Sequence, residues 1–345
     1  MEKTTKISAG QTFVLLFMSR VMYMMLFRAE RFDAGTPYML TQLFTTIIES
    51  LAVVPIVALF NAEQKLGVSE NEMFTKFENA LFCIYFLFIS VSTQVRFAGF
   101  IHQGFSEALR PWAVALIISL VSCYCAFGGI ESLARVGTVV LWIFLALFGL
   151  LAIINDGNPD FLNITPITVN DLPTMLDYGI DELSSNWWLP LLVSLRPYLR
   201  KGIGKVAYGY LVAKFVMVEI LILLVTLILW RYFAVASYPM LALGSYAKTE
   251  FVQHFGAINM LVWSLNCILV NGVYLFTSAR GKKILIPVFS VISVAVAIIC
   301  YNLALPFDSR PILTIKLVGI VALGIILPLV RLVALKIRSI KCAKL

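Results

Sequence analysis

The chain has 345 residues, of which 60% are hydrophobic and only 13% carry a charge. Most of these side chains cannot face water, so the composition excludes an ordinary soluble domain and predicts a membrane protein. The formal net charge of +8 does not indicate nucleic-acid binding, because the basic residues cap apolar stretches instead of forming a continuous face.

Ten apolar stretches make up nearly the whole chain, and most are close to the roughly 20 residues that a membrane-spanning helix needs. In chain order they are Gly10–Phe27, Tyr38–Phe60, Ala80–Phe100, Pro111–Phe127, Thr138–Ile154, Asn186–Leu199, Val206–Leu229, Asn259–Thr277, Ile284–Leu303 and Pro311–Leu335. They are too long and continuous for barrel strands. Because a lipid-exposed backbone must satisfy its own hydrogen bonds, we expect an all-α integral membrane protein with ten transmembrane helices.

The segments between these stretches are too short for a separate soluble domain, so we expect one membrane domain over residues 1–345. Ten helices divide into five plus five, and an odd number in each half inverts the second half relative to the first, as in many transporters. We place the first repeat at about 7–154, an external loop at 155–185, the second repeat at about 186–335 and a basic cytoplasmic tail at 336–345.

The placement of Lys and Arg predicts the direction of each span. Basic residues gather at one set of segment ends, and the opposite ends carry only Arg28, Arg31, Arg96, Arg110, Arg231, Lys248 and Arg310. The expected external loop contains no Lys or Arg but six carboxylates. The positive-inside rule therefore predicts that both termini are cytoplasmic.

The sixth stretch is too short for one regular span, and Pro190 and Pro197 each remove a backbone donor within it. In inverted-repeat transporters the first helix of each half is broken near the membrane midplane. The first stretch carries Ser19 and Arg20 in its interior. We therefore expect discontinuous first and sixth helices, with Arg20 either at a substrate site or else snorkelling outward or paired with a carboxylate.

Two carboxylates, Glu49 and Glu219, lie within the second and seventh stretches. A buried Glu could carry a proton in coupled transport or meet a substrate. The alternative is charge compensation, in which Glu49 pairs with Arg20, and Glu219 pairs with Lys214 or Arg196. For Glu49 both alternatives stay open; for Glu219 compensation by the nearby Lys214 is favoured.

Aromatic and polar residues near these breaks could line a binding pocket. The adjacent Trp187 and Trp188 also suit the interfacial belt, which is the favoured interpretation for that pair, and core packing is the ordinary role of Tyr23, Tyr85 and Ser90. The candidate substrate-binding residues are Ser19, Arg20, Val21, Met22, Tyr23, Tyr85, Ser185, Trp187 and Trp263.

Motifs of enzymes are weak in this chain. His102 and His254 are its only histidines, and neither belongs to an HExxH pattern. The cysteines lie mostly within apolar stretches and form no disulfide framework. We expect no enzyme activity, no cofactor and no metal site. Asn163–Thr165 fits a glycosylation acceptor, a pattern that is common by chance.

Several segments together resemble the spore germination permease family, the B subunits of GerA-type nutrient germinant receptors. The segments that carry the resemblance, in chain order, are Ile7–Gln11, Arg110–Trp112, Tyr124–Arg135, Pro197–Lys201, Ser237–Tyr246, Phe251 and Met260–Trp263. The resemblance implies the inverted-repeat fold of the amino acid–polyamine–organocation superfamily, with a nutrient site between the first, third, sixth and eighth helices. It also implies an A-type subunit and a C-type lipoprotein as partners in the spore inner membrane.

The first helix departs from this family pattern. Members usually place glycines at its break, whereas this chain has the bulky segment Ser19–Tyr23. The expected function is binding of a small nutrient germinant, an amino acid, with signalling to partner subunits. The alternative is a proton-coupled amino-acid permease that transports its substrate.

Overall fold

The computed structural model describes residues 6–26, 36–66, 72–104, 108–154, 164, 171–229, 238–246, 255–305 and 309–342. Within these ranges all the regular elements are helices, as predicted. Among the described residues, seven helices are long and apolar enough to cross a membrane, so the chain is a multi-pass membrane protein. Ten spans and an inverted repeat remain predictions. Of the predicted external loop, residues 155–163 and 165–170, which include Asn163 and Thr165, lie outside the described residues, whereas residues 172–184 form a helix.

The first half of the chain forms five helices. They are α1 (Ala9–Met25), α2 (Thr36–Leu66), α3 (Glu72–Gly104), α4 (Pro111–Phe127) and α5 (Gly129–Ile154). Helix α1 begins with a capping box, in which Ser8 and Gln11 each bond the other's backbone N–H. Gly129, with φ of 83°, forms the tight link between α4 and α5.

The predicted break in the first helix is wrong for the residues at which it was placed. Helix α1 runs without interruption through Ser19 and Arg20 and ends at Met25. The Ser19 hydroxyl donates to the Leu16 carbonyl of its own helix at 3.1 Å. Bulky side chains at this point are therefore compatible with the observed backbone, which is ordinary α-helix.

The second half is more interrupted. Its elements are α6 (Leu172–Ser184), α7 (Trp188–Leu195), the short 3-10 helix η4 (Arg196–Tyr198), α8 (Ile203–Leu229), α9 (Pro239–Tyr246), α10 (Phe255–Ser278), α11 (Leu285–Asn302), α12 (Arg310–Val321), the π-helical turn η5 (Ala322–Ile326) and α13 (Leu327–Cys342). The sixth apolar stretch therefore corresponds to α7 and η4, and α6 precedes it.

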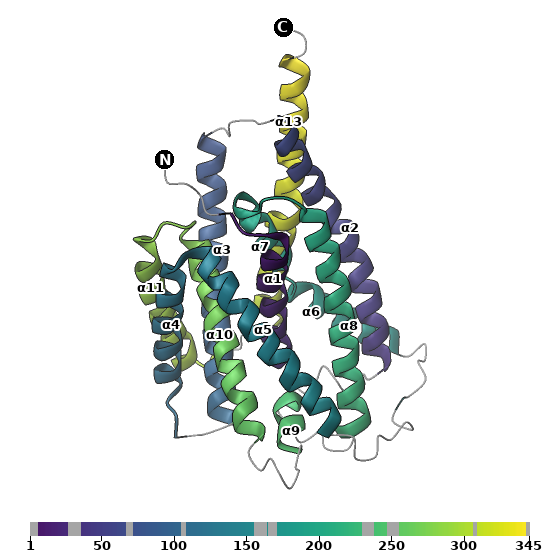
Figure 1. Ribbon diagram of the computed structural model, residues 1–345, viewed down its shortest axis with the longest axis vertical. Helices are drawn as coiled ribbons and strands as arrows, with labels where there is room; N and C mark the ends of the chain where they lie inside the picture. Colours follow the sequence, from purple (N-terminus) through teal and green to yellow (C-terminus); the bar gives the residue numbers. More distant parts are fainter. Residues whose placement is uncertain are drawn as a thin grey trace.

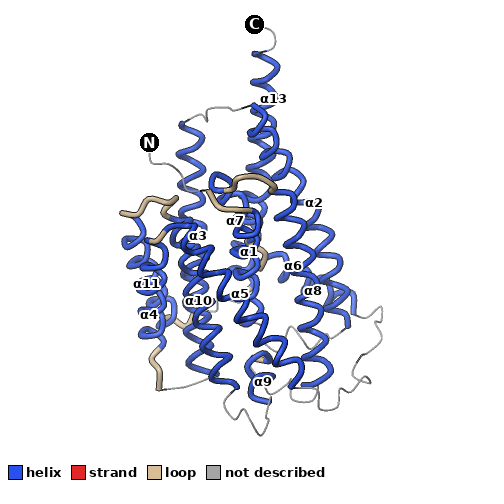
Figure 2. Tube along the Cα trace, in the orientation of Figure 1, coloured by secondary structure: helices blue, strands red, loops and turns tan. Residues whose placement is uncertain are grey.

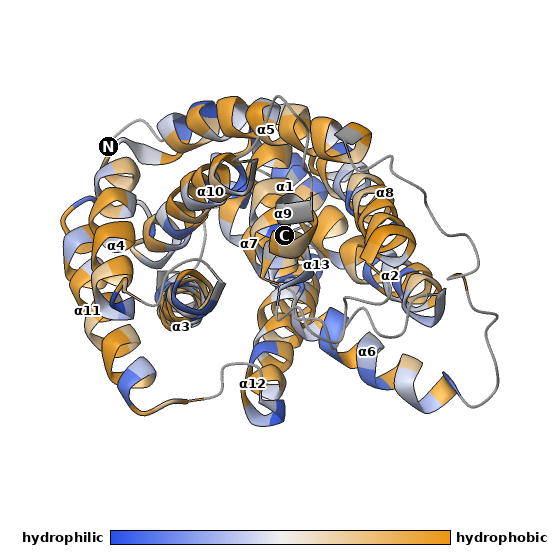
Figure 3. Cartoon of the chain, turned by 90° about the horizontal axis from the view of Figure 1, so that it is seen from below, coloured by the Kyte–Doolittle hydropathy of each residue, from blue (hydrophilic) through white to orange (hydrophobic). Residues whose placement is uncertain are grey.

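Helices α1 and α7 lie near the centre of the bundle (Figures 1 and 3). Helix α1 packs against α5, α8 and α10, while α10 also packs against α3 and α4. Helices α2 and α8 form one side of the molecule, and α4 and α11 form the other (Figures 2 and 3). Large apolar side chains, among them Leu51, Trp142 and Val291, are exposed on the outside, where lipid would cover them.

Two sets of contacts hold one end of the bundle together. The Ile7 N–H donates to the Tyr198 carbonyl at 2.8 Å, which ties the start of α1 to the end of η4. Nearby, Glu63 of α2 pairs with Arg196 at 3.1 Å and with Arg331 of α13 at 3.2 Å. Arg331 also pairs with Glu78 of α3. This ion cluster therefore joins four separate elements.

Candidate functional site

The break between α6 and α7 is the centre of the candidate site. Ser185, Asn186 and Trp187 separate the two helices. The hydroxyls of Ser184 and Ser185 donate to the Asp181 carbonyl at 2.8 and 2.6 Å, which competes with continued helix. Helix α7 then begins without a side-chain cap, so its first N–H groups and the positive end of its dipole face the break.

The π-helical turn η5 supports α7 at this point. A Cβ added to Gly324 would lie 2.9 Å from Leu189 Cβ and 3.3 Å from Pro190 Cδ. The glycine thus permits close approach of η5 to the beginning of α7. π-Helical turns often occur at functional sites.

A buried ion pair joins α1 to the end of α6. The Arg20 guanidinium lies 2.5 Å from Glu182 Oε1 and donates to Asn186 Oδ1 at 3.2 Å. Tyr38 of α2 donates to the other Glu182 oxygen at 3.2 Å. All four residues are buried. Arg20 therefore does not snorkel outward but pairs with a carboxylate.

A second buried pair joins α2 to α8. Lys214 Nζ lies 2.7 Å from Glu49 Oε1 and 3.4 Å from Glu182 Oε1. Glu49 also accepts hydrogen bonds from Asn186 Nδ2 at 2.5 Å and Trp188 Nε1 at 3.2 Å. Two cations and two carboxylates thus share one hydrogen-bonded network, which we call the buried charge network: Arg20, Glu49, Glu182, Asn186 and Lys214.

The pairing differs from both compensation schemes expected from the sequence. Arg20 bonds Glu182 and not Glu49, and Lys214 bonds Glu49 and Glu182 and not Glu219. Arg196 pairs with Glu63. Glu219 lies farther along α8, half-buried, and its Oε1 atom accepts no hydrogen bond from any described residue.

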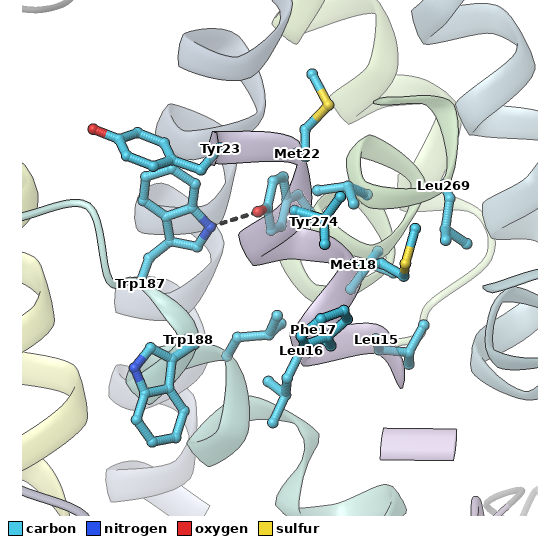
Figure 4. Packing of buried hydrophobic residues seen from close by; sticks show 14 of the residues in the cluster. Leu15, Leu16, Phe17, Met18, Met22, Tyr23, Trp187, Trp188, Leu269 and Tyr274 are labelled. Carbon is cyan, nitrogen blue, oxygen red and sulfur yellow. Dashed lines mark hydrogen bonds between the residues drawn. The ribbon is translucent and has the colours of Figure 1, made fainter. Parts of the chain in front are cut away.

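Aromatic side chains also lie at the break, where Trp187 is beside Tyr23 and Tyr274 (Figure 4). The Trp187 indole donates to the Tyr274 hydroxyl at 2.5 Å, and its ring meets Tyr23 edge-on with centroids 5.0 Å apart. The hydroxyls of Ser185 and Tyr23 are hydrogen-bonded to each other. The Arg96 guanidinium lies 4.7 Å from the centre of the Tyr23 ring. The site thus combines charged, amide and aromatic groups within one buried region.

Three tryptophans do not lie where the sequence suggested. Trp187 and Trp188 are both buried inside the bundle, so their assignment to an interfacial belt is wrong. Trp263 packs against Phe100 with ring centroids 5.1 Å apart. It lies eleven residues before Tyr274 on α10, which is about 16 Å along the helix axis. Trp263 is therefore remote from the break.

The structure brings Arg20, Tyr23, Ser185 and Trp187 together, as proposed from the sequence. Val21 and Met22 are buried in the core, and Tyr85 packs against Phe86 and faces Gly319 of α12. Ser90 belongs to a separate polar contact, in which it donates to Asn271 at 2.6 Å.

Sequence reasoning did not assign Tyr38, Glu182, Asn186, Trp188, Lys214, Tyr274 or Lys316 to the site. Lys316 lies in α12, with its Nζ 6.0 Å from the centre of the Trp187 ring. The signal for Lys214 and Lys316 was present, because each is a cation inside an apolar stretch. No such signal marked Tyr274, an aromatic residue in an apolar helix.

One comparison with known proteins gave a match over most of this chain. The family model for spore permeases, described as spore germination protein, matches residues 6–311. Comparison with curated proteins gave no match. The matched region includes α1, the break between α6 and α7, and all residues of the buried charge network. The chain therefore belongs to the spore germination permease family.

Proposed function

We propose that this protein is a transporter-fold subunit of a spore germinant receptor, which binds a small nutrient, an amino acid, and signals to partner subunits. The partners are an A-type subunit and a C-type lipoprotein, and the complex resides in the spore inner membrane with both termini of this chain in the cytoplasm. Family membership supports the role in germination. The observation that carries the binding role is the interrupted helix at residues 185–187, enclosed by charged and aromatic side chains.

The break offers groups that suit the carboxylate and an apolar side chain of an amino acid. The uncapped beginning of α7 presents N–H donors and a positive dipole end, which suit a carboxylate. The faces of Tyr23, Trp187 and Tyr274 suit an apolar side chain. Trp187 immediately precedes α7, and its ring contacts Tyr23 and Tyr274, so one small molecule could contact both the N–H donors and the rings.

Binding at this point would require the aromatic side chains to move. Trp187 packs against both Tyr23 and Tyr274, and all three side chains are buried. A ligand that replaces the Trp187–Tyr274 and Ser185–Tyr23 hydrogen bonds favours a different arrangement of α1, α7 and α10. The free energy with which the ligand shifts this equilibrium cannot exceed the difference between its binding free energies for the two arrangements. The partner subunits would respond to that shift.

Thermal unfolding of the protein in nanodiscs, with each of the common L-amino acids added in turn, tests this proposal. We expect at least one amino acid to raise the unfolding midpoint, because a ligand at about 100 times its Kd stabilises the folded state by about 2.7 kcal/mol. Trp187→Phe removes the indole donor and should reduce the shift. Trp142→Phe, on the exposed surface of α5, is the matched control. Absence of any shift, or equal shifts in both variants, would contradict the proposal.

Proton-coupled transport is the alternative function. Glu182 is paired with Arg20 and Glu49 with Lys214, and carboxylates held in ion pairs favour a binding role over proton release at this site. Uptake of the stabilising amino acid into proteoliposomes separates the two functions. Accumulation that a protonophore abolishes would establish transport and overturn a role in sensing alone.

A further inference from the structure

One face of α8 points away from the bundle and carries a carboxyl group. Val212, Val216 and Ile220 are exposed on this face, Val212 to 64%. Glu219 follows Val212 by seven residues, which is two helical turns, so both side chains lie on the same side of the helix. Glu219 is only about 5 Å along the axis from the midpoint of α8. It therefore lies deep in the hydrocarbon layer.

Among the described residues, none donates a hydrogen bond to Oε1 of this carboxyl group. Glu219 is half-buried, and its Oε1 atom lies against the protein without a hydrogen bond from any described residue. Lys214, the cation nearest in sequence, contacts Glu49 and Glu182 instead. Hydrocarbon contains no water that could hydrate the group. Ionisable side chains in such positions generally have a polar partner.

The same face is shaped for a second helix. Gly209 is exposed, and a Cβ added there would have no atom within 4 Å. Ala213 follows four residues later and is only partly covered. Two small residues at this spacing let another transmembrane helix approach the backbone closely. The α8 outer face, which we define as Gly209, Val212, Ala213, Val216, Glu219 and Ile220, thus combines a flat surface with a hydrogen-bond acceptor.

We propose that the α8 outer face binds a transmembrane helix of a different protein, which presents a Lys or Arg side chain to Glu219. A basic group is the strongest donor to a carboxylate. A second copy of this chain does not fit, because its mid-span cations Arg20, Lys214 and Lys316 are buried. The inference goes beyond the amino-acid site, since Glu219 lies outside the buried charge network.

Photo-crosslinking in membranes of sporulating cells tests this interface. Benzoylphenylalanine replaces Val212 on the α8 outer face or, as a control, Val291, which is 69% exposed on α11 at the opposite side of the bundle (Figure 3). We expect a discrete adduct from position 212 and not from position 291. Mass spectrometry should identify the linked peptide as a membrane-spanning segment with Lys or Arg.

Substitutions at Glu219 then test the role of the carboxyl group. Glu219→Leu should lower the yield of the adduct at least tenfold, and Glu219→Lys combined with Glu at the basic position of the partner should restore it. An unchanged yield in Glu219→Leu, a linked peptide without a basic residue, an adduct only to lipid or to a second copy, or failure of the charge exchange would each overturn the proposal.

A structural role for Glu219 within the isolated protein is tested separately. Purified Glu219→Leu in nanodiscs should unfold at or above the wild-type temperature, because the substitution removes a polar group from a lipid-facing surface. It should also keep the amino-acid response, so a loss of crosslinking is distinguishable from failure of the proposed function. A midpoint lowered by more than about 5 °C would assign the carboxyl group to folding and overturn the interface.

Discussion

Lys214 lies near the middle of α8, and its ammonium group contacts two carboxylates that come from two other helices. Loss of either partner of a buried pair leaves a charge without compensation, which costs about 3–5 kcal/mol, whereas removal of both is often tolerated. Lys214 therefore contributes to the stability of the folded protein mainly by preventing a buried carboxylate from being left without a partner. The pair with Glu49 can be removed while Arg20 and Glu182 remain matched.

We predict that Lys214→Met and Glu49→Gln each destabilise the protein by about 3 kcal/mol or more, and that the double variant is less unstable than the sum of both. Chemical unfolding in detergent micelles, followed by tryptophan fluorescence, measures these values. Arg135→Ala, which breaks an exposed pair with Glu131 on α5, should cost less than about 1 kcal/mol. Additive losses would contradict the observed pairing.

Arg20 has a direct ionic contact with Glu182, whereas Glu49 is bonded to Lys214. In double-mutant cycles we predict that Arg20→Met couples more strongly to Glu182→Gln than to Glu49→Gln, with a coupling energy of about 1–3 kcal/mol for the first pair. The same unfolding assay provides the measurement. Equal coupling to both carboxylates would indicate one diffuse network instead of two defined pairs.

At the scale of the elements, contact between α3 and α12 depends on one glycine. A Cβ at Gly319 would overlap Cε2 and Cδ2 of the Tyr85 ring, closer than Cβ atoms pack in folded proteins. Tyr85 is itself buried and packed against Phe86, so the ring has little room to withdraw. The glycine therefore determines how near α12 lies to α3.

Gly319→Ala is predicted to lower stability by about 1–3 kcal/mol through overpacking. Gly149→Ala on α5 is the matched control, because a Cβ there meets no atom within 4 Å. That control should be neutral or stabilise by up to about 1 kcal/mol, since Ala favours helix over Gly. Thermal unfolding of both variants checks the pair, and similar behaviour of the two would show that α12 can shift freely.

The position of most helices follows from the length of apolar stretches, because the bilayer requires a certain length and excludes open backbone. The interruption before α7 was also predictable, since Pro190 and a short apolar stretch are local features. The continuity of α1 was not. Arg20 is compensated by Glu182, which lies 162 positions away in the chain, and no local pattern shows such a contact. Tyr274 was concealed in the same way, because the indole of Trp187, to which it is hydrogen-bonded, lies 87 positions away in the chain.

At the scale of the whole molecule, the beginning of α1 and the end of α13 lie towards the same end, and the end of α3 and the beginning of α4 lie at the other (Figure 1). The ion cluster of Glu63, Glu78, Arg196 and Arg331 belongs to the first of these ends. Which end faces the cytoplasm is a prediction from charge, because Lys and Arg favour the cytoplasmic side.

Single cysteines placed in a variant without native thiols test this orientation. We predict that Lys6→Cys and Lys336→Cys react with an impermeant maleimide only after the membrane is opened, whereas Arg110→Cys reacts in intact cells. These positions are exposed in the structure, so burial does not limit labelling. Labelling of Lys6→Cys and Lys336→Cys from opposite sides would require an odd number of spans. Inverted labelling of all three would reverse the predicted direction.

The close approach of Gly324 to the beginning of α7 gives that short helix a pivot point near one of its ends. A rotation of α7 would therefore turn about Leu189 and Pro190, the residues nearest to a Cβ added at Gly324. From this pivot the segment extends about 4 Å to Trp187 and about 13 Å to Tyr198, if each residue adds about 1.5 Å. A rotation of α7 that displaces Trp187 by about 1 Å would thus displace Tyr198 by about 3 Å. Tyr198 is hydrogen-bonded to Ile7, and the nearby Arg196 pairs with Glu63. A small displacement of the aromatic rings would therefore become a larger displacement where α1 begins and α2 ends.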